Sequence, residues 1–445
     1  MNRQRARFKD ALRTQLWPAP ALGVVLAVGI GATLPMLDAA LAGQLPPAAS
    51  AWLFGGGPDA ARAMLQAVAG SLITVTSLTF SLTVVTLQLA SSQFSPRLLR
   101  TFSADRVVHL TLALFLATFA YALTVLRSIR TRENDGGAFV PELSVTVAFW
   151  LTIASVIGLV LFLAHLAREL RVETMLFRVH VETNETIDAV FPELEGEPPA
   201  IPEAPATTVR VEASTSGFLT GLNEEALFKA ALSAGAVVRI DREPGSSLIR
   251  GVPVATVWSL DRGSPPAGEV LSTLGQRINA AIMTGHERTS VQDVGFGFRQ
   301  LVDVASRALS PGINDPTTAV HALGHLSSLI CRLTGRDPGP RTVTDGEGRV
   351  RVVLSLPRLA DLLDLALRQP RLYGSKDPLV MARMLELVHE VGWHDRRGRY
   401  RTALCSQLAQ LRQALDAASY TAEERHWLEQ LASELPAPLP EDHDS

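Results

Sequence analysis

Four stretches of the chain are apolar over about 20 residues or more, the length that a membrane-spanning helix needs. They cover residues 17–37, 64–90, 107–126 and 143–166. Helical spacing of apolar residues continues past the fourth stretch to about residue 190, interleaved with Arg and Glu. We therefore predict an α-helical membrane protein with four transmembrane helices. Residues 1–190 would form the transmembrane domain, including an extension of the fourth helix beyond the membrane as one long helix.

The rest of the chain predicts a cytoplasmic α+β region. Prolines over residues 191–206 predict a semi-rigid linker. Residues 207–260 alternate between apolar and polar positions around Gly and Pro-Gly breaks, which predicts a small β-rich module. Helical spacing then dominates residues 261–435, which predict a mainly helical domain interrupted by one hairpin. The polar tail at 436–445 is predicted to be disordered.

The β-rich module contains the run PGSSLIRGVPVATV, from Pro244 to Val257. This run and its layout resemble the small barrel-sandwich domains of lipoyl and biotinyl carriers, which implies a barrel-sandwich-like fold. Those carriers attach their group to a lysine at a turn. No lysine stands at the corresponding turn here, so the resemblance does not imply carrier chemistry.

Start signals mark several helices of the C-terminal half. Asp315 and Asp377 each precede a proline, which is the pattern of a capping residue with Pro at the first helical position. Thr421 and Glu424 have the spacing of a capping box. These residues predict three helix beginnings.

Composition supports a membrane protein with a soluble part. Charged residues make up 19% of the chain, below the quarter or so that is typical of soluble domains. A net charge of −3 gives no reason to expect nucleic acid as a partner. The two cysteines, Cys331 and Cys405, form no disulfide framework, which is typical of a reducing compartment.

Basic residues predict the orientation in the membrane. They precede the first apolar stretch, separate the second from the third, and follow the fourth, so the positive-inside rule places both termini in the cytoplasm. These residues are Arg3, Arg5, Arg7, Lys9, Arg13, Arg97, Arg100, Arg106, Arg168 and Arg171.

The second apolar stretch is unusually rich in Ser, Thr and Gln. On a helix these residues form two neighbouring stripes. The first contains Thr74, Ser77, Ser81, Gln88 and Ser91. The second contains Thr76, Thr79, Thr83, Thr86 and Gln93.

Three interpretations of these stripes are open. Small and hydroxylated residues allow helices to pack closely, so the stripes could be packing surfaces. Stripes from several subunits could instead line an aqueous path, where hydroxyl and amide groups replace part of an ion's hydration shell. Arg97 and Arg100 would then favour anions at the cytoplasmic mouth. The alternation of Ser77, Thr79, Ser81 and Thr83 is also compatible with a membrane β-strand, which the three helical neighbours disfavour.

The soluble half offers one candidate ligand or interface site, in the run FGFRQLVDVASRALSPGINDPTTAV. Arg299, Asp303 and Arg307 are spaced by four on one helix face, and the backbone N–H groups of the following helix start could bind an anion with an arginine closing over it. A structural salt-bridge ladder and helix corner is the alternative. The residues concerned are Arg299, Asp303, Arg307, Asn314 and Asp315.

Evidence for an enzyme is weak. His321 and His325 have a spacing that can bind a metal, but two histidines without a clear third ligand predict no metal site. Asp315 or His286 could serve as the third ligand if folding brings either residue close to the two histidines. The chain has no P-loop, nucleophile elbow or zinc-binding cysteine cluster. We therefore predict no catalytic residues and no cofactor.

The polar second stretch, the run SSQFSPRLLR, the run FVPELSV and the run SPGIND together resemble the domain-of-unknown-function 2254 family of predicted bacterial membrane proteins. The similarity extends over nearly the whole chain. It implies a bacterial inner-membrane protein with the topology above, and no particular activity.

Two functional hypotheses remain. The first is a homo-oligomeric ion channel or passive transport protein, with the polar helix lining the path and the cytoplasmic domain assembling or gating it. The absence of Asp, Glu or Lys deep in any stretch argues against a proton-coupled carrier. The second is a membrane-anchored sensor or scaffold whose cytoplasmic domain binds a protein or a small anionic ligand.

Overall fold

The structure is a computed structural model that describes residues 17–41, 53–93, 105–130, 139–169, 171–193, 200–260 and 266–433. The chain divides into two compact units, Met1–Arg171 and Val172–Ser445. The predicted tail at 436–445 and the basic residues before the first helix lie outside the described residues, as do residues 194–199 of the proline-rich segment.

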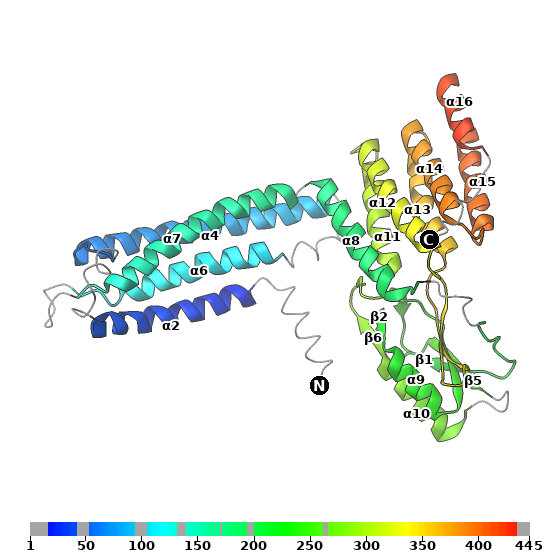
Figure 1. Cartoon of the computed structure of the whole chain (residues 1–445), viewed down its shortest axis with the longest axis horizontal. Coiled ribbons are helices and arrows are strands. Elements are labelled where there is room, and N and C mark those ends of the chain that lie inside the picture. Colours follow the sequence, from blue (N-terminus) through cyan, green and yellow to red (C-terminus); the bar gives the residue numbers. More distant parts are fainter. Residues whose placement is uncertain are drawn as a thin grey trace, which may run out of the picture. The chain divides into compact units, whose positions relative to one another are not determined.

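Among its described residues, the first unit has four helices that are long and apolar enough to cross a membrane: α2 (Pro18–Leu41), α4 (Pro58–Gln93), α6 (Arg106–Leu126) and α7 (Glu142–Glu169). Figure 1 shows them side by side as a bundle. The four predicted apolar helices are confirmed.

Helix α6 is the central helix of the first unit, since it packs against α2, α4 and α7. Its buried side chains include Phe115, Tyr121 and Val125. At the beginning of α7, the carboxylate of Asp38 in α2 accepts hydrogen bonds from the backbone N–H groups of Leu143 and Ser144, at 2.9 and 3.0 Å. An acidic side chain at this position satisfies N–H groups that no helical carbonyl can reach.

The long single helix predicted after the membrane is two helices instead. Arg171 is not helical, and its N–H donates to the carbonyl of Arg168 in a tight turn. Helix α8 (Val172–Val190) then begins and packs against α11 (Val294–Ala308) and α12 (Pro316–Thr334) within the second unit. Its apolar residues keep helical spacing because they face these helices, and spacing alone does not reveal the break at Arg171.

The β-rich region is built of open sheets and is not a barrel, which corrects the barrel-sandwich prediction. One sheet has the strand order β1-β5-β3-β8-β7 and the other β4-β2-β6. The strands are β1 (Val209–Glu212), β2 (Gly217–Leu222), β3 (Ala236–Ile240), β4 (Ser247–Leu248), β5 (Pro253–Ser259), β6 (Ile282–Gly285), β7 (Arg341–Thr344) and β8 (Val350–Leu354).

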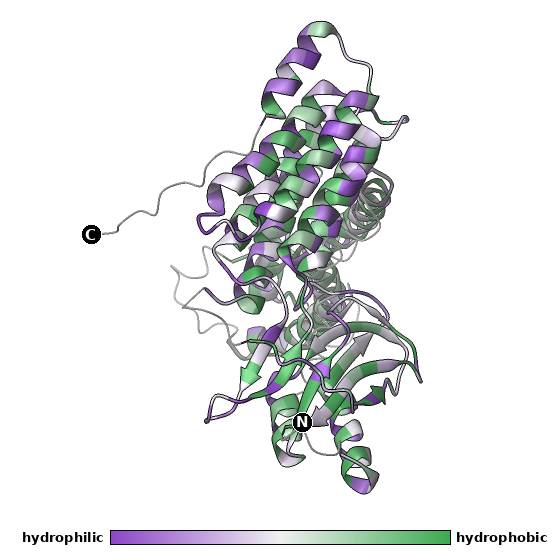
Figure 2. Cartoon of the chain, turned by 90° about the vertical axis from the view of Figure 1, so that its right-hand side faces the viewer, coloured by the Kyte–Doolittle hydropathy of each residue, from purple (hydrophilic) through white to green (hydrophobic). Residues whose placement is uncertain are grey.

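The hairpin of β7 and β8 is an integral part of the first sheet. Strand β8 pairs in parallel with β3, and Val352 and Leu354 belong to the same apolar core as Val238 and Ile240. Helices α9 (Glu224–Ser233) and α10 (Gly268–Ala281) pack together, and α9 also packs against β3 and β8. Figure 2 shows the largely hydrophobic strands that form this core.

The other helices of the second unit form a bundle. They are α11, α12, α13 (Leu359–Gly374), α14 (Pro378–His394), α15 (Arg401–Ala417) and α16 (Ala422–Leu431). The capping predictions are confirmed. Asp315 accepts from the N–H of Thr318, Asp377 accepts from the N–H groups of Leu379 and Val380, and Thr421 and Glu424 form a capping box.

Candidate functional site

The two polar stripes of α4 have different surroundings in the folded unit. We call Thr76, Thr79, Thr83 and Thr86 the threonine stripe. All four are buried, and each hydroxyl donates to the carbonyl four residues earlier, at 2.6 to 2.9 Å. Because α4 packs mainly against α6, this stripe is a packing surface whose hydroxyl groups are satisfied within α4. The segment is helical, so the β-strand interpretation is wrong.

The other stripe lies on the exposed face of α4. We call Thr74, Ser77, Ser81 and Gln88 the polar seam; all four are exposed. At about 100° per residue, the four residues fall within about 60° of one another around the helix axis. Exposed apolar residues flank them on both sides, with Ile73 and Phe80 on one side and Leu78 and Val85 on the other.

A shallow depression lies over the middle of the polar seam. It is lined by Ile73, Thr74, Ser77, Leu78 and Ser81. The predicted pore residues Arg97 and Arg100 lie outside the described residues, as does the side chain of Ser91. The structure thus brings four of the predicted seven residues together on one exposed face.

The second unit contains a charged cavity of about 210 Å³. It lies among the turn between β3 and β4, the beginning of α11 and the beginning of α13. Its charged lining residues are Glu243, Arg288, Asp293, Arg299 and Asp361. Acidic side chains outnumber basic ones in this lining.

Asp293 is the central residue of the cavity wall. Its side chain caps α11 by accepting from the N–H of Phe296 at 3.0 Å. The guanidinium of Arg288 donates to both carboxylate oxygens, at 2.8 and 2.9 Å. Gly245 packs directly above: a Cβ on this residue would lie 2.0 Å from Oδ2 of Asp293, and its φ is +86°. The Pro-Gly turn therefore requires glycine in order to close over the buried carboxylate of Asp293.

Two carboxyl groups of the cavity are harder to ionise than in water. Burial raises the pKa of Glu243, and the negative charges of Asp361 and Asp293 add to the rise. Burial also raises the pKa of Asp293, against the opposing effect of Arg288. A cationic ligand or a proton would relieve this concentration of negative charge.

The structure separates the five residues of the predicted anion site. Arg299 lines the charged cavity near the beginning of α11. Asp303 and Arg307 lie farther along the helix, whereas Asn314 and Asp315 follow its end. Both carboxylate oxygens of Asp315 accept from Thr318, at 3.1 and 2.6 Å, and these bonds lower the pKa of Asp315.

Asn314 shapes the corner between α11 and α12. Its φ of +51° is left-handed, a conformation that Asn tolerates better than most residues. Its N–H donates to the carbonyl of Ser310, and the N–H of Asp315 donates to that of Ala308. The SPGIND run therefore has a structural explanation as a helix corner.

Other cavity residues were missed by the sequence interpretation. Asp293 has the cap position before a helix, and Glu243 directly precedes the Pro-Gly turn. These local signals were available. Local patterns cannot show that Asp361, more than a hundred residues away from Glu243, lines the same cavity.

His321 and His325 have different neighbours. Nδ1 of His321 lies 4.0 Å from a carboxylate oxygen of Glu173. The ring of His325 lies 5.1 Å from the ring of His180 in α8. Burial lowers the pKa of both His180 and His325, and it also lowers the pKa of His389 in α14.

These three histidines predict that the second unit loses stability in mild acid. Their folded pKa values lie below the unfolded value of about 6.5, so their contribution is complete above pH 6.5 and decreases as the pH falls below it. We expect the urea midpoint of the full-length protein in detergent, followed by circular dichroism, to decrease between pH 7 and pH 5. Replacing the three histidines by Gln should flatten this slope, whereas the exposed control His286→Gln should retain it. An unchanged slope in the triple variant would contradict the assignment.

Comparisons with known proteins agree with the motif resemblance. Residues 13–390 match a family model described as "Predicted membrane protein (DUF2254)". An uncharacterized protein of Mycobacterium tuberculosis is 34% identical over 412 residues, which cover 92% of this chain and 77% of the relative. An uncharacterized protein of Mycobacterium bovis has the same identity and coverage. No solved structure matches the chain.

Proposed function

We propose that this chain, which belongs to the DUF2254 family of predicted membrane proteins, is a homo-oligomeric ion channel or passive transport protein. In this proposal helix α4 lines the path, and the second unit assembles or gates it. The protein would lie in the bacterial inner membrane with both termini in the cytoplasm, as the distribution of basic residues favours.

The observation that carries the proposal is the polar seam. A helix facing only lipid gains nothing from exposed hydroxyl and amide groups, and burying a polar group in hydrocarbon without a partner is costly. The hydroxyl of Thr74 donates to the carbonyl of Gly70 at 3.1 Å, so a threonine alone could be accommodated in lipid. The longer amide side chain of Gln88 favours water or another subunit.

The arrangement around the seam supports several copies in preference to one. Apolar residues flank the seam on both sides, so adjacent α4 helices could contact each other through these flanks. The hydroxyl and amide groups would then face a common axis, where they could replace part of an ion's hydration shell. Arg97 and Arg100 follow α4 in sequence and would favour anions at its cytoplasmic end.

A second candidate function is a membrane-anchored sensor, which the charged cavity of the second unit favours. Its volume of about 210 Å³ suits a small ligand. The carboxyl groups of Glu243, Asp293 and Asp361 favour a cationic group over the anionic ligand expected from Arg299 alone. In this alternative the polar seam would only pack subunits together.

Conductance of the purified protein in planar bilayers tests the channel proposal. We expect ion conductance from the native protein, with a loss of about tenfold or more in Gln88→Leu and Ser81→Leu, since both changes replace a seam polar group by an apolar one. Val85→Leu, on the exposed apolar flank of the same helix, is the matched control. It keeps an apolar side chain where neighbouring α4 helices would contact each other, so it should conduct normally.

Native mass spectrometry of each variant separates a loss of conductance from a loss of assembly. A well-assembled native protein without conductance in any salt would overturn the channel proposal and favour the sensor. Equal conductance in Gln88→Leu, Ser81→Leu and Val85→Leu would show that the polar seam does not line the path.

A further inference from the structure

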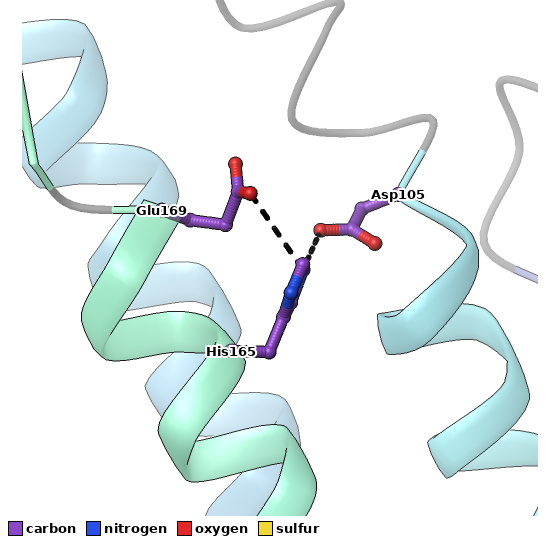
Figure 3. A group of neighbouring side chains, drawn as sticks. All are labelled: Asp105, His165 and Glu169. Carbon is purple, nitrogen blue, oxygen red and sulfur yellow. Dashed lines mark hydrogen bonds and ion pairs between the residues drawn. The ribbon is translucent and has the colours of Figure 1, made fainter. Parts of the chain in front are cut away.

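Three side chains that could coordinate a metal converge where α6 begins and α7 ends. They are Asp105, which directly precedes α6, and His165 and Glu169 of α7 (Figure 3). Nε2 of His165 lies 2.5 Å from Oδ2 of Asp105 and 4.0 Å from Oε1 of Glu169. The three ligand atoms all lie within 4.8 Å of one another.

The backbone fixes this cluster from both sides. Asp105 is the N-cap of α6, and its Oδ1 accepts from the N–H of Val107 at 2.8 Å. This bond orients the carboxylate so that Oδ2 faces His165. His165 and Glu169 are one helical turn apart and therefore share a face of α7. All three side chains are largely shielded, with exposed fractions of 11%, 18% and 9% for Asp105, His165 and Glu169.

We propose that Asp105, His165 and Glu169 bind a divalent transition-metal ion, for which Zn²⁺ is the first candidate. One imidazole nitrogen and two carboxylate oxygens form a donor set that zinc accepts, with a water molecule as the fourth ligand. The imidazole favours such metals over Mg²⁺ and Ca²⁺, which prefer oxygen ligands alone.

The geometry needs only a small adjustment. Ligands at about 2.0–2.2 Å from a tetrahedral zinc ion lie roughly 3.3 Å apart. The observed separations from Nε2 of His165 are 2.5 and 4.0 Å, one shorter and one longer than this value. Rotating the carboxylate of Asp105 slightly away and that of Glu169 slightly closer would open the position of the ion.

The charges also favour a dication. Two neighbouring carboxylates attract a dication, and the shielding of the cluster from water strengthens this attraction. A Zn²⁺ ion with a neutral imidazole neutralises both carboxylates. The hydrogen bond from Val107 to Asp105 is the kind of outer contact that orients a metal ligand.

A bound ion would connect α6 to α7 across the first unit. Since an ion that binds only the folded state stabilises it, Zn²⁺ should raise the unfolding temperature of the first unit. This binding site does not depend on the channel proposal.

Isothermal titration calorimetry of the full-length, tag-free and chelator-treated protein in detergent, with ZnCl₂ as the titrant, tests the site. We expect one ion per chain, and an affinity at least tenfold lower in His165→Gln and Glu169→Gln. Both variants retain hydrogen-bonding side chains of similar size, so the helices should still pack. His321→Gln is the matched control, because it removes a histidine of the other candidate pair, and it should bind Zn²⁺ normally.

Cobalt provides a second measurement that does not depend on stability. Co²⁺ in a low-coordinate site of this kind absorbs visible light, and the band should be lost in His165→Gln. Absence of zinc binding by the native protein, or equal affinity and an unchanged cobalt spectrum in His165→Gln and Glu169→Gln, would overturn the proposal. Loss of binding in His321→Gln alone would move the site to the second unit and would overturn it as well.

Discussion

Asp293→Ala should open the beginning of α11, at a cost of about 2–3 kcal/mol for the lost helix cap and the lost charged hydrogen bonds. The substitution removes the helix cap and both bonds from Arg288 at once. It also leaves the guanidinium of Arg288 without the carboxylate to which it donates two hydrogen bonds beneath the Gly245 turn. Breaking a shielded ion pair on one side is far more costly than the pair's net contribution, because the remaining charge is left uncompensated.

Hydrogen exchange of the full-length protein in detergent measures this opening locally. Protection of the α11 amides should fall by about 30- to 100-fold, since each 1.4 kcal/mol is a factor of ten. Asp293→Asn retains a side-chain oxygen that can accept from the N–H of Phe296, so its α11 amides should lose less protection than those of Asp293→Ala.

The control is Glu225→Ala, which breaks the exposed ion pair with Lys229 in the same unit. Exposed pairs contribute little, so protection should barely change. Equal protection in Asp293→Ala and Glu225→Ala would contradict the role assigned to the buried pair.

The membrane helices are the part of the fold that the sequence predicts well. A run of about 20 apolar residues has few alternatives to a spanning helix, because its backbone groups must be satisfied within the segment. The periodicity of α4 also revealed two polar stripes. It did not indicate that Thr79 faces α6 whereas Ser81 faces outward, because that depends on where neighbouring helices pack.

The sheet shows where local patterns fail. Strand β8 has the apolar composition of a buried strand, yet its partner β3 lies more than a hundred residues earlier in the chain. Alternation of residues predicts a strand and gives no information about its partner. The barrel-sandwich prediction failed for this reason: residues 207–260 contain strands of both sheets, and β6, β7 and β8 complete those sheets from outside this range.

For the candidate sites, too, local patterns predict single residues but not which residues meet. Asp315 was recognised from its capping pattern, but the pattern could not separate a cap from an anion site, and the structure shows a cap. Asp105 and His165 lie 60 residues apart, so their contact requires the packing of α6 against α7. Helical spacing can place His165 and Glu169 on one face of α7, but it cannot show that a residue of another helix lies beside them.

The run GFGF, residues 295–298 at the beginning of α11, leads to a second strong prediction. Gly297 lies where α11 crosses α8, and a Cβ on this residue would lie 1.8 Å from Oγ1 of the buried Thr183. Gly297→Ala should therefore push the helices apart and destabilise the second unit by about 1–3 kcal/mol. Hydrogen exchange should increase in α8 and α11 together, because both lose the same contact.

A matched glycine and a partner substitution separate crowding from helix propensity. Gly324 lies within α12 with no atom within 4 Å of an added Cβ, so Gly324→Ala should stabilise its helix by about 0.5–1 kcal/mol. Thr183→Ala removes the hydroxyl and should restore part of the stability of Gly297→Ala. The rescue is partial because the Cβ of residue 183 would still lie 2.8 Å from the new methyl group. If Gly297→Ala were as harmless as Gly324→Ala, this result would contradict the close crossing of α8 and α11.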